Sequence, residues 1–202
     1  MSDQLKAYHH GDLRAALLQA AEEELIEKGA DRFSLRSVAK RASVSHAAPA
    51  HHFGDVKGLL IALAGGGFGR FVETMRVFQE KGGADPTERM MQTGFGYIDF
   101  ALKNPALFRL MFGSRRPGVT DEDFLENAVA AFNHLLECVT DMTGGDPETE
   151  ISARTDVASA WAVVHGLAEL LIAGSPLYLV EAPDDQRQAI IREIISRSLK
   201  AA

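Results

Sequence analysis

The chain has 202 residues, of which 46% are hydrophobic and 24% are charged, and its formal net charge is −7. This length and apolar content are enough for one large or two small domains with a substantial core. A single cysteine, Cys138, excludes an intrachain disulfide framework, and the chain shows neither a run of about 18 apolar residues nor a signal-peptide pattern. We therefore expect a cytoplasmic protein.

Apolar spacing and helix-start residues predict an almost wholly helical chain. Three predicted starts share an Asp or Asn followed by Pro, namely Asp85-Pro86, Asn104-Pro105 and Asp146-Pro147. No convincing strand pattern is found, and residues 177–180 are the nearest candidate. The predicted fold is therefore all-α with about nine helices, near residues 11–28, 35–41, 46–52, 55–80, 86–103, 105–112, 121–142, 147–173 and 184–200.

Residues 34–60 have the pattern of a helix-turn-helix. The first helix has an apolar face at Leu35, Val38, Ala39 and Ala42, and Ser34 can cap its start. The second helix has mostly small or imidazole side chains on its exposed side. A helix this slim fits into the major groove, so duplex DNA is the leading partner.

The chain resembles the TetR family of transcriptional regulators over residues 8–60. The matching positions are Leu17, Ala20, Ala21, Leu25, Gly29, Phe33, Ser34, Leu35, Val38, Ala39, Val44, Ser45, Phe53, Leu59 and Leu60. The later segment Trp161-x-x-x-His165-Gly166 resembles one branch of that family. The resemblance implies a helix-turn-helix DNA-binding domain at residues 1–57 and a helical effector-binding and dimerisation domain at residues 58–202.

On this resemblance, candidate DNA contacts can be assigned. The side chains of His46, Ala47 and Ala48 would reach base edges, while Ser34, Arg36, Ser45, His52 and Lys57 would contact phosphates. The candidates are Ser34, Arg36, Ser45, His46, Ala47, Ala48, His51, His52 and Lys57. Residues 1–57 carry eight Lys or Arg and eight Asp or Glu, so this part of the chain is neutral. We expect its glutamates at 22, 23, 24 and 27 to lie away from the motif.

Three positions depart from the family pattern. Ser43 stands where the family usually has Gly in the turn, Ala50 where it commonly has Tyr, and Val56 where it usually has Lys. Phosphate contacts supply much of the affinity for DNA, so these changes favour an alternative reading. In that alternative, the chain is a helical ligand- or partner-binding protein of the same fold with weakened DNA binding.

The second domain is rich in Phe and Met at helical spacing. Such stripes can be plain core, but the family's C-terminal domain usually encloses a small-molecule site, so we expect an apolar effector pocket. The candidate lining residues are Phe71, Met75, Met91, Phe95, Phe108, Phe112, Phe132, Trp161 and His165. The resemblance also implies a homodimer built from the last two long helices, with candidate interface residues Val164, Leu171, Ile191, Ile194 and Ile195.

The sequence also contains an unusual glycine run and lacks the common enzyme motifs. Four glycines at 65–69 lie inside a predicted helix, where they indicate close helix approach, a break in the helix, or a hinge that passes effector binding to the DNA-binding domain. No spacing typical of catalytic, metal or cofactor sites occurs, so we expect a non-enzyme without cofactor or metal. The predicted function is a homodimeric repressor that leaves a near-palindromic operator when it binds a small apolar effector.

Overall fold

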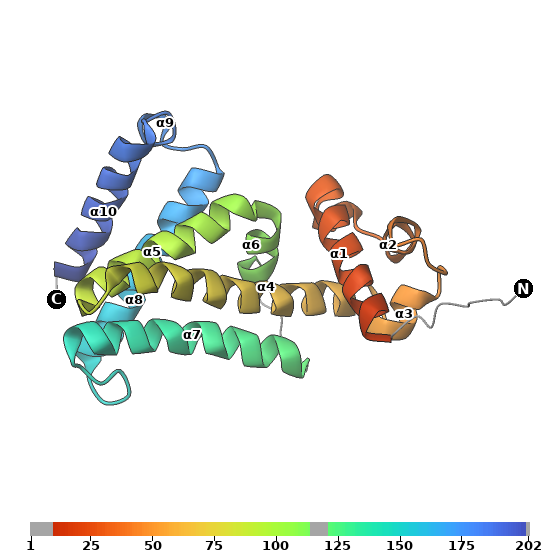
Figure 1. The fold of residues 1–202 in the computed structure, drawn as a ribbon, viewed down its shortest axis with the longest axis horizontal. Coiled ribbons are helices and arrows are strands. Elements are labelled where there is room, and N and C mark those ends of the chain that lie inside the picture. The colour runs from red at the N-terminus through yellow and green to blue at the C-terminus, as the bar shows by residue number, and fades with distance from the viewer. Residues whose placement is uncertain (1–9, 114–120, 201–202) are drawn as a thin grey trace, which may run out of the picture.

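The computed structural model describes residues 10–113 and 121–200, and every regular element within these ranges is helical (Figure 1). The elements in chain order are α1 (His10–Lys28), η1 (Ala30–Arg32), α2 (Leu35–Arg41), α3 (Ala48–Phe53), α4 (Val56–Gln79), η2 (Glu80–Gly82), α5 (Pro86–Lys103), α6 (Pro105–Phe112), α7 (Glu122–Thr143), α8 (Ile151–Ile172), α9 (Leu177–Val180) and α10 (Asp184–Lys200). The prediction of an all-α fold is confirmed. Residues 177–180, the nearest strand candidate, form the short helix α9.

Helix α4 joins the two parts of the molecule. Helices α1, α2 and α3 gather at its N-terminal end, α5, α6 and α7 pack against the rest of it, and α8 and α10 pack against α5 (Figure 1). The domain boundary expected at 57/58 falls in the first turn of this helix. Because α4 crosses the boundary without interruption, the two parts share one rigid element.

Two of the α4 glycines at residues 65–69 lie at close contacts with neighbouring helices, and the helix is not split. A Cβ atom on Gly65 would lie 3.0 Å from the Cα atom of Phe124, and one on Gly67 would lie 2.8 Å from the sulfur of Met111. Gly66 faces open space. The close-approach explanation therefore holds for Gly65 and Gly67, since a larger residue at either place would push α7 or α6 away.

The predicted helix starts at Asp85 and Asn104 agree with the structure, but the one at Asp146 is wrong. Asp85 accepts a hydrogen bond from the N–H of Thr87, and α5 begins at the next residue. Asp146 instead accepts bonds from the N–H of Glu148 and the hydroxyl of Thr149, both at 2.8 Å. These bonds close a local turn, so α8 begins only at Ile151.

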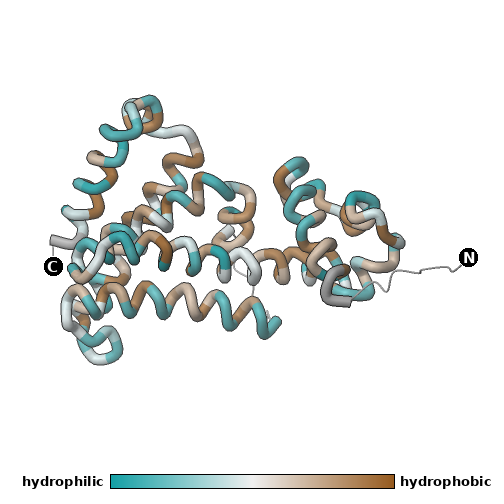
Figure 2. Tube along the Cα trace, viewed as in Figure 1, coloured by the Kyte–Doolittle hydropathy of each residue, from teal (hydrophilic) through white to brown (hydrophobic). Residues whose placement is uncertain are grey.

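Apolar side chains from both parts of the molecule form one continuous core cluster, which extends from Leu17 and Val38 through Leu59 to Phe108 and Ile195. Apolar and polar segments alternate along most helices, as amphipathic helices require (Figure 2). By length and composition alone α8 could cross a membrane, contrary to our expectation of no such run. It packs against α5, α7 and α10, which explains its apolar content as that of a core helix.

Candidate DNA-binding surface and ligand pocket

Helices α2 and α3 are joined by a tight turn that reverses the chain. The N–H of Val44 donates to the carbonyl of Ala39 at 3.0 Å, and Ser43 takes a φ of 56°. This is the left-handed conformation that glycine adopts at least cost. The structure therefore gives a reason for the Gly that the family usually has here, and Ser43 adopts the required conformation without it.

The candidate DNA contacts lie at the start of α2, in the turn between α2 and α3, on α3, and at the start of α4. Exposed members are Arg36, Ser45, His46, Ala47, His51 and Lys57, while Ser34, Ala48 and His52 are half-buried. Helix α3 spans residues 48–53 rather than 46–52, so His46 and Ala47 belong to the turn before it. Ala50 is exposed on the same helix.

Ser34 is committed to the helix cap. Its hydroxyl oxygen accepts from the N–H of Ser37 at 3.2 Å, and its hydroxyl group donates to the Oγ atom of Ser37 at 3.0 Å. The Nζ atom of Lys28 donates to the same Ser37 oxygen at 3.3 Å. The hydroxyl hydrogen of Ser34 is therefore already used within the protein, which argues against its predicted phosphate contact.

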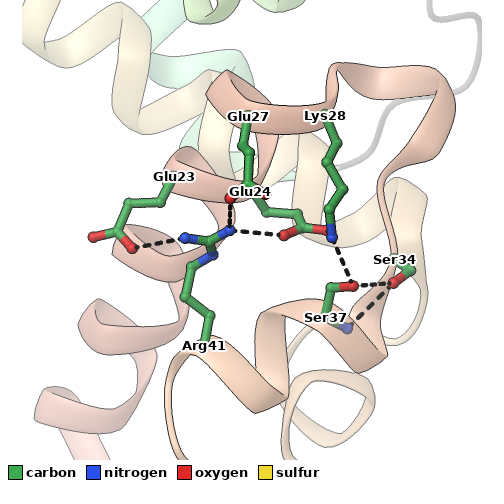
Figure 3. Close-up of polar contacts among 7 residues, drawn as sticks. All are labelled: Glu23, Glu24, Glu27, Lys28, Ser34, Ser37 and Arg41. Carbon is green, nitrogen blue, oxygen red and sulfur yellow. Dashed lines mark hydrogen bonds and ion pairs between the residues drawn. The ribbon is translucent and has the colours of Figure 1, made fainter.

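A buried carboxylate holds α2 against α1, contrary to the expectation that the α1 glutamates lie away from the motif (Figure 3). Glu24 is 1% exposed and accepts from Lys28 at 2.8 Å and from Arg41 at 3.2 Å. Arg41 also pairs with Glu23 at 3.6 Å and with Glu27. Burial alone would raise the pKa of Glu24, but the hydrogen bonds from Lys28 and Arg41 outweigh it and lower the pKa.

Helix α3 is tied closely to the start of α4. Asp55 caps α4 by accepting from the N–H of Gly58 at 2.8 Å. A Cβ atom on Gly58 would lie 2.0 Å from the carbonyl oxygen of Phe53, the last residue of α3. On the other side of Phe53, the guanidinium group of Arg14 lies 5.4 Å from the ring centroid. The position of α3 is thus set by contacts with both α1 and α4.

The second part of the molecule contains a pocket of about 320 Å³ between α4, α5, α6, α7 and α8. It is lined by Phe68, Phe71, Met75, Met90, Thr93, Gly94, Tyr97, Phe112, Ala128, Ala131, Phe132, Leu135, Trp161 and Val164. This volume is at the lower end of the range for small-molecule sites, and its mainly apolar wall is typical of them.

Five of the nine candidate lining residues lie in this wall, namely Phe71, Met75, Phe112, Phe132 and Trp161. The other four do not. Met91 lines a second cavity near the α7–α8 connection. Phe108 is fully buried behind Phe112, with ring centroids 4.9 Å apart, and Phe95 lies under the guanidinium of Arg192 at 5.6 Å. His165 bonds to Tyr97 from behind the wall.

The sequence reading missed Thr93 and Tyr97 as lining residues. With Met90 they occupy positions i, i+3 and i+7 of α5, so they share one helical face. That spacing was visible in the sequence. A lone Thr and Tyr on an otherwise apolar helix face are equally typical of a buried core, so this spacing alone does not indicate a pocket.

A short polar network adjoins the pocket. The Oη atom of Tyr97 lies 2.8 Å from the Nδ1 atom of His165, and an interaction with the side chain of Trp161 lowers the pKa of the same phenol. Burial raises the pKa of Tyr97 and lowers the pKa of His165. Both shifts keep the two groups uncharged near neutral pH.

Most of the residues predicted for the dimer interface are covered within the protomer. Val164 lines the pocket, and Leu171, Ile191 and Ile195 are buried, while Ile194 is half-buried. The apolar seams of α8 and α10 therefore dock on their own domain, which accounts for the pattern read from the sequence. Other faces of these helices are free to meet a partner, and large exposed apolar residues on α8 include Ile151, Trp161 and Leu170.

Comparisons with known proteins agree with this architecture. Among solved structures, a protein of unknown function from Rhodococcus sp. RHA1 is 32% identical, with a TM-score of 0.76 and coverage of 97% of this chain and 96% of its own. A TetR-like transcriptional regulator from the same organism is 16% identical, with a TM-score of 0.66 and coverage of 96% and 100%. The fatty acid degradation regulator FadR from Bacillus halodurans is 17% identical, with a TM-score of 0.64 and coverage of 95% and 97%.

No curated protein matches the sequence. Two family models do match: bacterial regulatory proteins of the tetR family at residues 17–63, and the tetracyclin repressor-like C-terminal domain at residues 90–195. The first covers the helices around the candidate DNA-binding surface, and the second covers most of the helices around the pocket. The chain therefore belongs to the TetR family of transcriptional regulators.

Proposed function

We propose that the protein is a cytoplasmic, homodimeric repressor that leaves a near-palindromic operator when a small apolar effector enters its pocket. The observation that carries this proposal is the arrangement of two sites on one helix. Helix α4 contributes Phe68, Phe71 and Met75 to the pocket wall, and its first turn supports α3 on the opposite end.

The α3 surface has the properties that a major-groove reader needs. Its side chains are small or imidazole, so the backbone can approach base edges closely, and Arg36 and Lys57 at its border are exposed cations. Two such surfaces related by a two-fold axis would contact two half-sites and require a near-palindromic operator. The candidate faces for dimerisation are the exposed sides of α8 and α10.

Contacts between α1 and the ligand-binding part give a route from pocket to DNA. Arg70 of α4 makes two hydrogen bonds to Glu22 of α1, at 2.8 and 2.9 Å, and Arg14 of α1 pairs with Asp123 of α7 at 3.4 Å. Helix α7 also contributes to the pocket wall. An effector that favours another position of α7 or α4 would thereby change the position of α1 and α3.

A mobility-shift assay with DNA flanking the protein's own coding region tests this proposal. We expect a shift at low salt that a small apolar effector reverses. Arg36→Ala should weaken binding to all sequences and reduce the slope of log K against log salt by about one, because one phosphate contact is lost. Lys103→Ala is the control, since it removes one positive charge from an exposed site on α5.

The alternative remains a helical ligand- or partner-binding protein with weak DNA contact, which the exposed Ala50 on α3 favours. A folded protein that shifts no DNA at low salt would support this alternative and contradict the repressor proposal. An unchanged salt slope in Arg36→Ala would show that α2 does not face the phosphate backbone.

A further inference from the structure

The pocket wall contains few groups that can form hydrogen bonds. Among the described side chains that line it, only those of Thr93, Tyr97 and Trp161 carry a hydrogen-bonding N–H or hydroxyl group. None of these described lining residues is a Lys, Arg, His, Asp or Glu. A charged ligand would therefore meet no opposite charge among them.

Both hydroxyl groups have a hydrogen-bond partner within the protein. The hydroxyl of Thr93 donates to the carbonyl oxygen of Arg89 at 2.9 Å. The indole of Trp161, which can only donate, interacts with the phenol of Tyr97 and lowers its pKa. The Oη atom of Tyr97 lies 2.8 Å from the Nδ1 atom of His165, and the phenol donates this hydrogen bond when the imidazole carries its own hydrogen on Nε2.

With the phenol hydrogen donated to His165, the oxygens of Thr93 and Tyr97 offer a ligand lone pairs that accept hydrogen bonds. A ligand hydroxyl or N–H can donate to them. A carboxylate or phosphate needs donors and would lose its hydration without replacement, which is costly in an apolar site. An ammonium group would find acceptors but no carboxylate to balance its charge.

Two aromatic rings lie where the pocket opens. Phe132 of α7 and Trp161 of α8 both line the pocket, yet they are 44% and 40% exposed, and their ring centroids are 6.2 Å apart. These two rings mark the place where the pocket reaches solvent, and neither can bind the charged head group of a longer ligand by an ion pair.

We propose that the effector is a small, uncharged, mainly hydrocarbon molecule with a hydroxyl or N–H donor for Tyr97 or Thr93, and that the pocket rejects carboxylates. This inference rests on the proposed function, because it names the ligand class of the same pocket. The proposal predicts that the pocket binds an uncharged head group more tightly than a charged one, and this difference in affinity can be measured without DNA.

Trp161 is the only tryptophan in the chain and lines the pocket, so its fluorescence reports binding directly. The full-length protein is titrated with 1-decanol, decanoate and decylamine, each below its aggregation concentration. We expect 1-decanol to bind at least about tenfold more tightly than either charged probe, because neither charge is compensated on the wall. Equal or tighter binding of decanoate would overturn the proposal, as would a lack of saturable binding by all three probes.

Thr93→Val and Tyr97→Phe test the acceptor role. Each should reduce the affinity for 1-decanol by up to about fivefold and leave that for methyl decyl ether, which has no donor, nearly unchanged. Thr155→Val is the matched control, because Thr155 makes the same bond to the carbonyl four residues earlier on the exposed face of α8. If neither pocket variant changes the preference for the alcohol over the ether, the acceptor role is wrong.

This experiment separates the ligand class from the proposed function. A protein that shifts operator DNA but prefers decanoate would retain the repressor proposal and exclude the ligand class. A protein that prefers 1-decanol but shifts no DNA would retain the ligand class and exclude the repressor proposal.

Discussion

A single buried glutamate organises the packing of α1 against α2. Glu24 is enclosed on α1 yet keeps its charge, because Lys28 and Arg41 donate to its two oxygens. A buried carboxylate without such partners would destabilise the fold. The role of Glu24 is therefore structural. Because the guanidinium group of Arg41 pairs with Glu24 and its neighbours, we do not count Arg41 among the candidate DNA contacts.

Replacement of Glu24 by Gln should lower the free energy of unfolding by about 1–2 kcal/mol at pH 7, because two charge-assisted hydrogen bonds are weakened. The pKa of Glu24 is lowered in the folded state. Its contribution is therefore complete above the unfolded pKa of about 4.5 and disappears as pH falls through the lower folded pKa. Urea unfolding at pH 7 and at pH 4 measures both effects.

The difference in stability between parent and Glu24→Gln should shrink as the pH falls below 4.5. Glu23→Gln is the control, because Glu23 is exposed and its distance to Arg41 is 3.6 Å, so a much smaller loss is expected. A gap between parent and Glu24→Gln that widens on acidification would contradict the assigned ionised state.

At the scale of elements, glycine has opposite roles at two positions of α4. At Gly58 the absence of a side chain lets α3 end directly on the first turn of α4. Gly66 is exposed, and no atom lies near the place where its Cβ would be. Glycine therefore allows no close contact at this position, and it lowers the stability of the helix because its helix propensity is low. The two positions therefore predict opposite effects of the same substitution.

Gly58→Ala should destabilise the protein by about 1–3 kcal/mol and weaken operator binding, since a backbone carbonyl must move to admit the methyl group. Gly66→Ala should raise stability by up to about 1 kcal/mol. Thermal unfolding followed by circular dichroism, together with operator affinity, measures both variants. A stable Gly58→Ala variant with unchanged DNA affinity would show that the α3–α4 contact is not restrictive.

Gly66→Ala also tests the proposed hinge at residues 65–69. If the effector lowers operator affinity by the same factor in this variant as in the parent, Gly66 has no hinge role in the coupling. A smaller factor, in a variant that is at least as stable as the parent, would support one.

The whole molecule is built on one core that extends from the DNA-binding helices to the pocket. Leu17, Leu59 and Phe71 belong to the same buried cluster, and α4 continues through both parts. The two regions that the family models match therefore differ in function, but they share the helix α4 and are not separate structural units. We expect the two parts to unfold together rather than as independent domains.

Thermal or urea unfolding should show one transition with the same midpoint in two signals. Trp161 fluorescence reports the pocket, and far-ultraviolet circular dichroism reports all helices. An apolar ligand of the pocket should raise both midpoints by the same amount, because it binds only the folded state. Separate midpoints would show that the DNA-binding part unfolds on its own.

Much of the fold was predictable because helix signals are local. Asp85-Pro86 and the apolar face at Leu35, Val38 and Ala39 depend on residues within one or two turns of each other. The start at Asp146 was wrong because an Asx residue caps a turn as readily as a helix, and nothing in the sequence there distinguishes the two.

The sequence predicted which helices would line the pocket better than it predicted the individual lining residues. Helical spacing placed Phe71 and Met75 together, but it could not tell that Phe108 turns into the core while Phe112 faces the cavity. In the same way, the apolar seam at Val164 and Leu171 is equally consistent with a partner subunit and with the protein's own α5 and α10. Only the packing of helices distinguishes these cases.

The sequence by itself determined the helices, the helix-turn-helix and the family, because each is encoded by residues close together along the chain or by a motif at fixed spacing. The tertiary structure alone decided that Glu24 pairs with Arg41, that Tyr97 and Thr93 enter the pocket wall, and that Ile191 and Ile195 are covered. These contacts join helices distant in sequence. Their geometry depends on how the helices cross, which no single helix encodes.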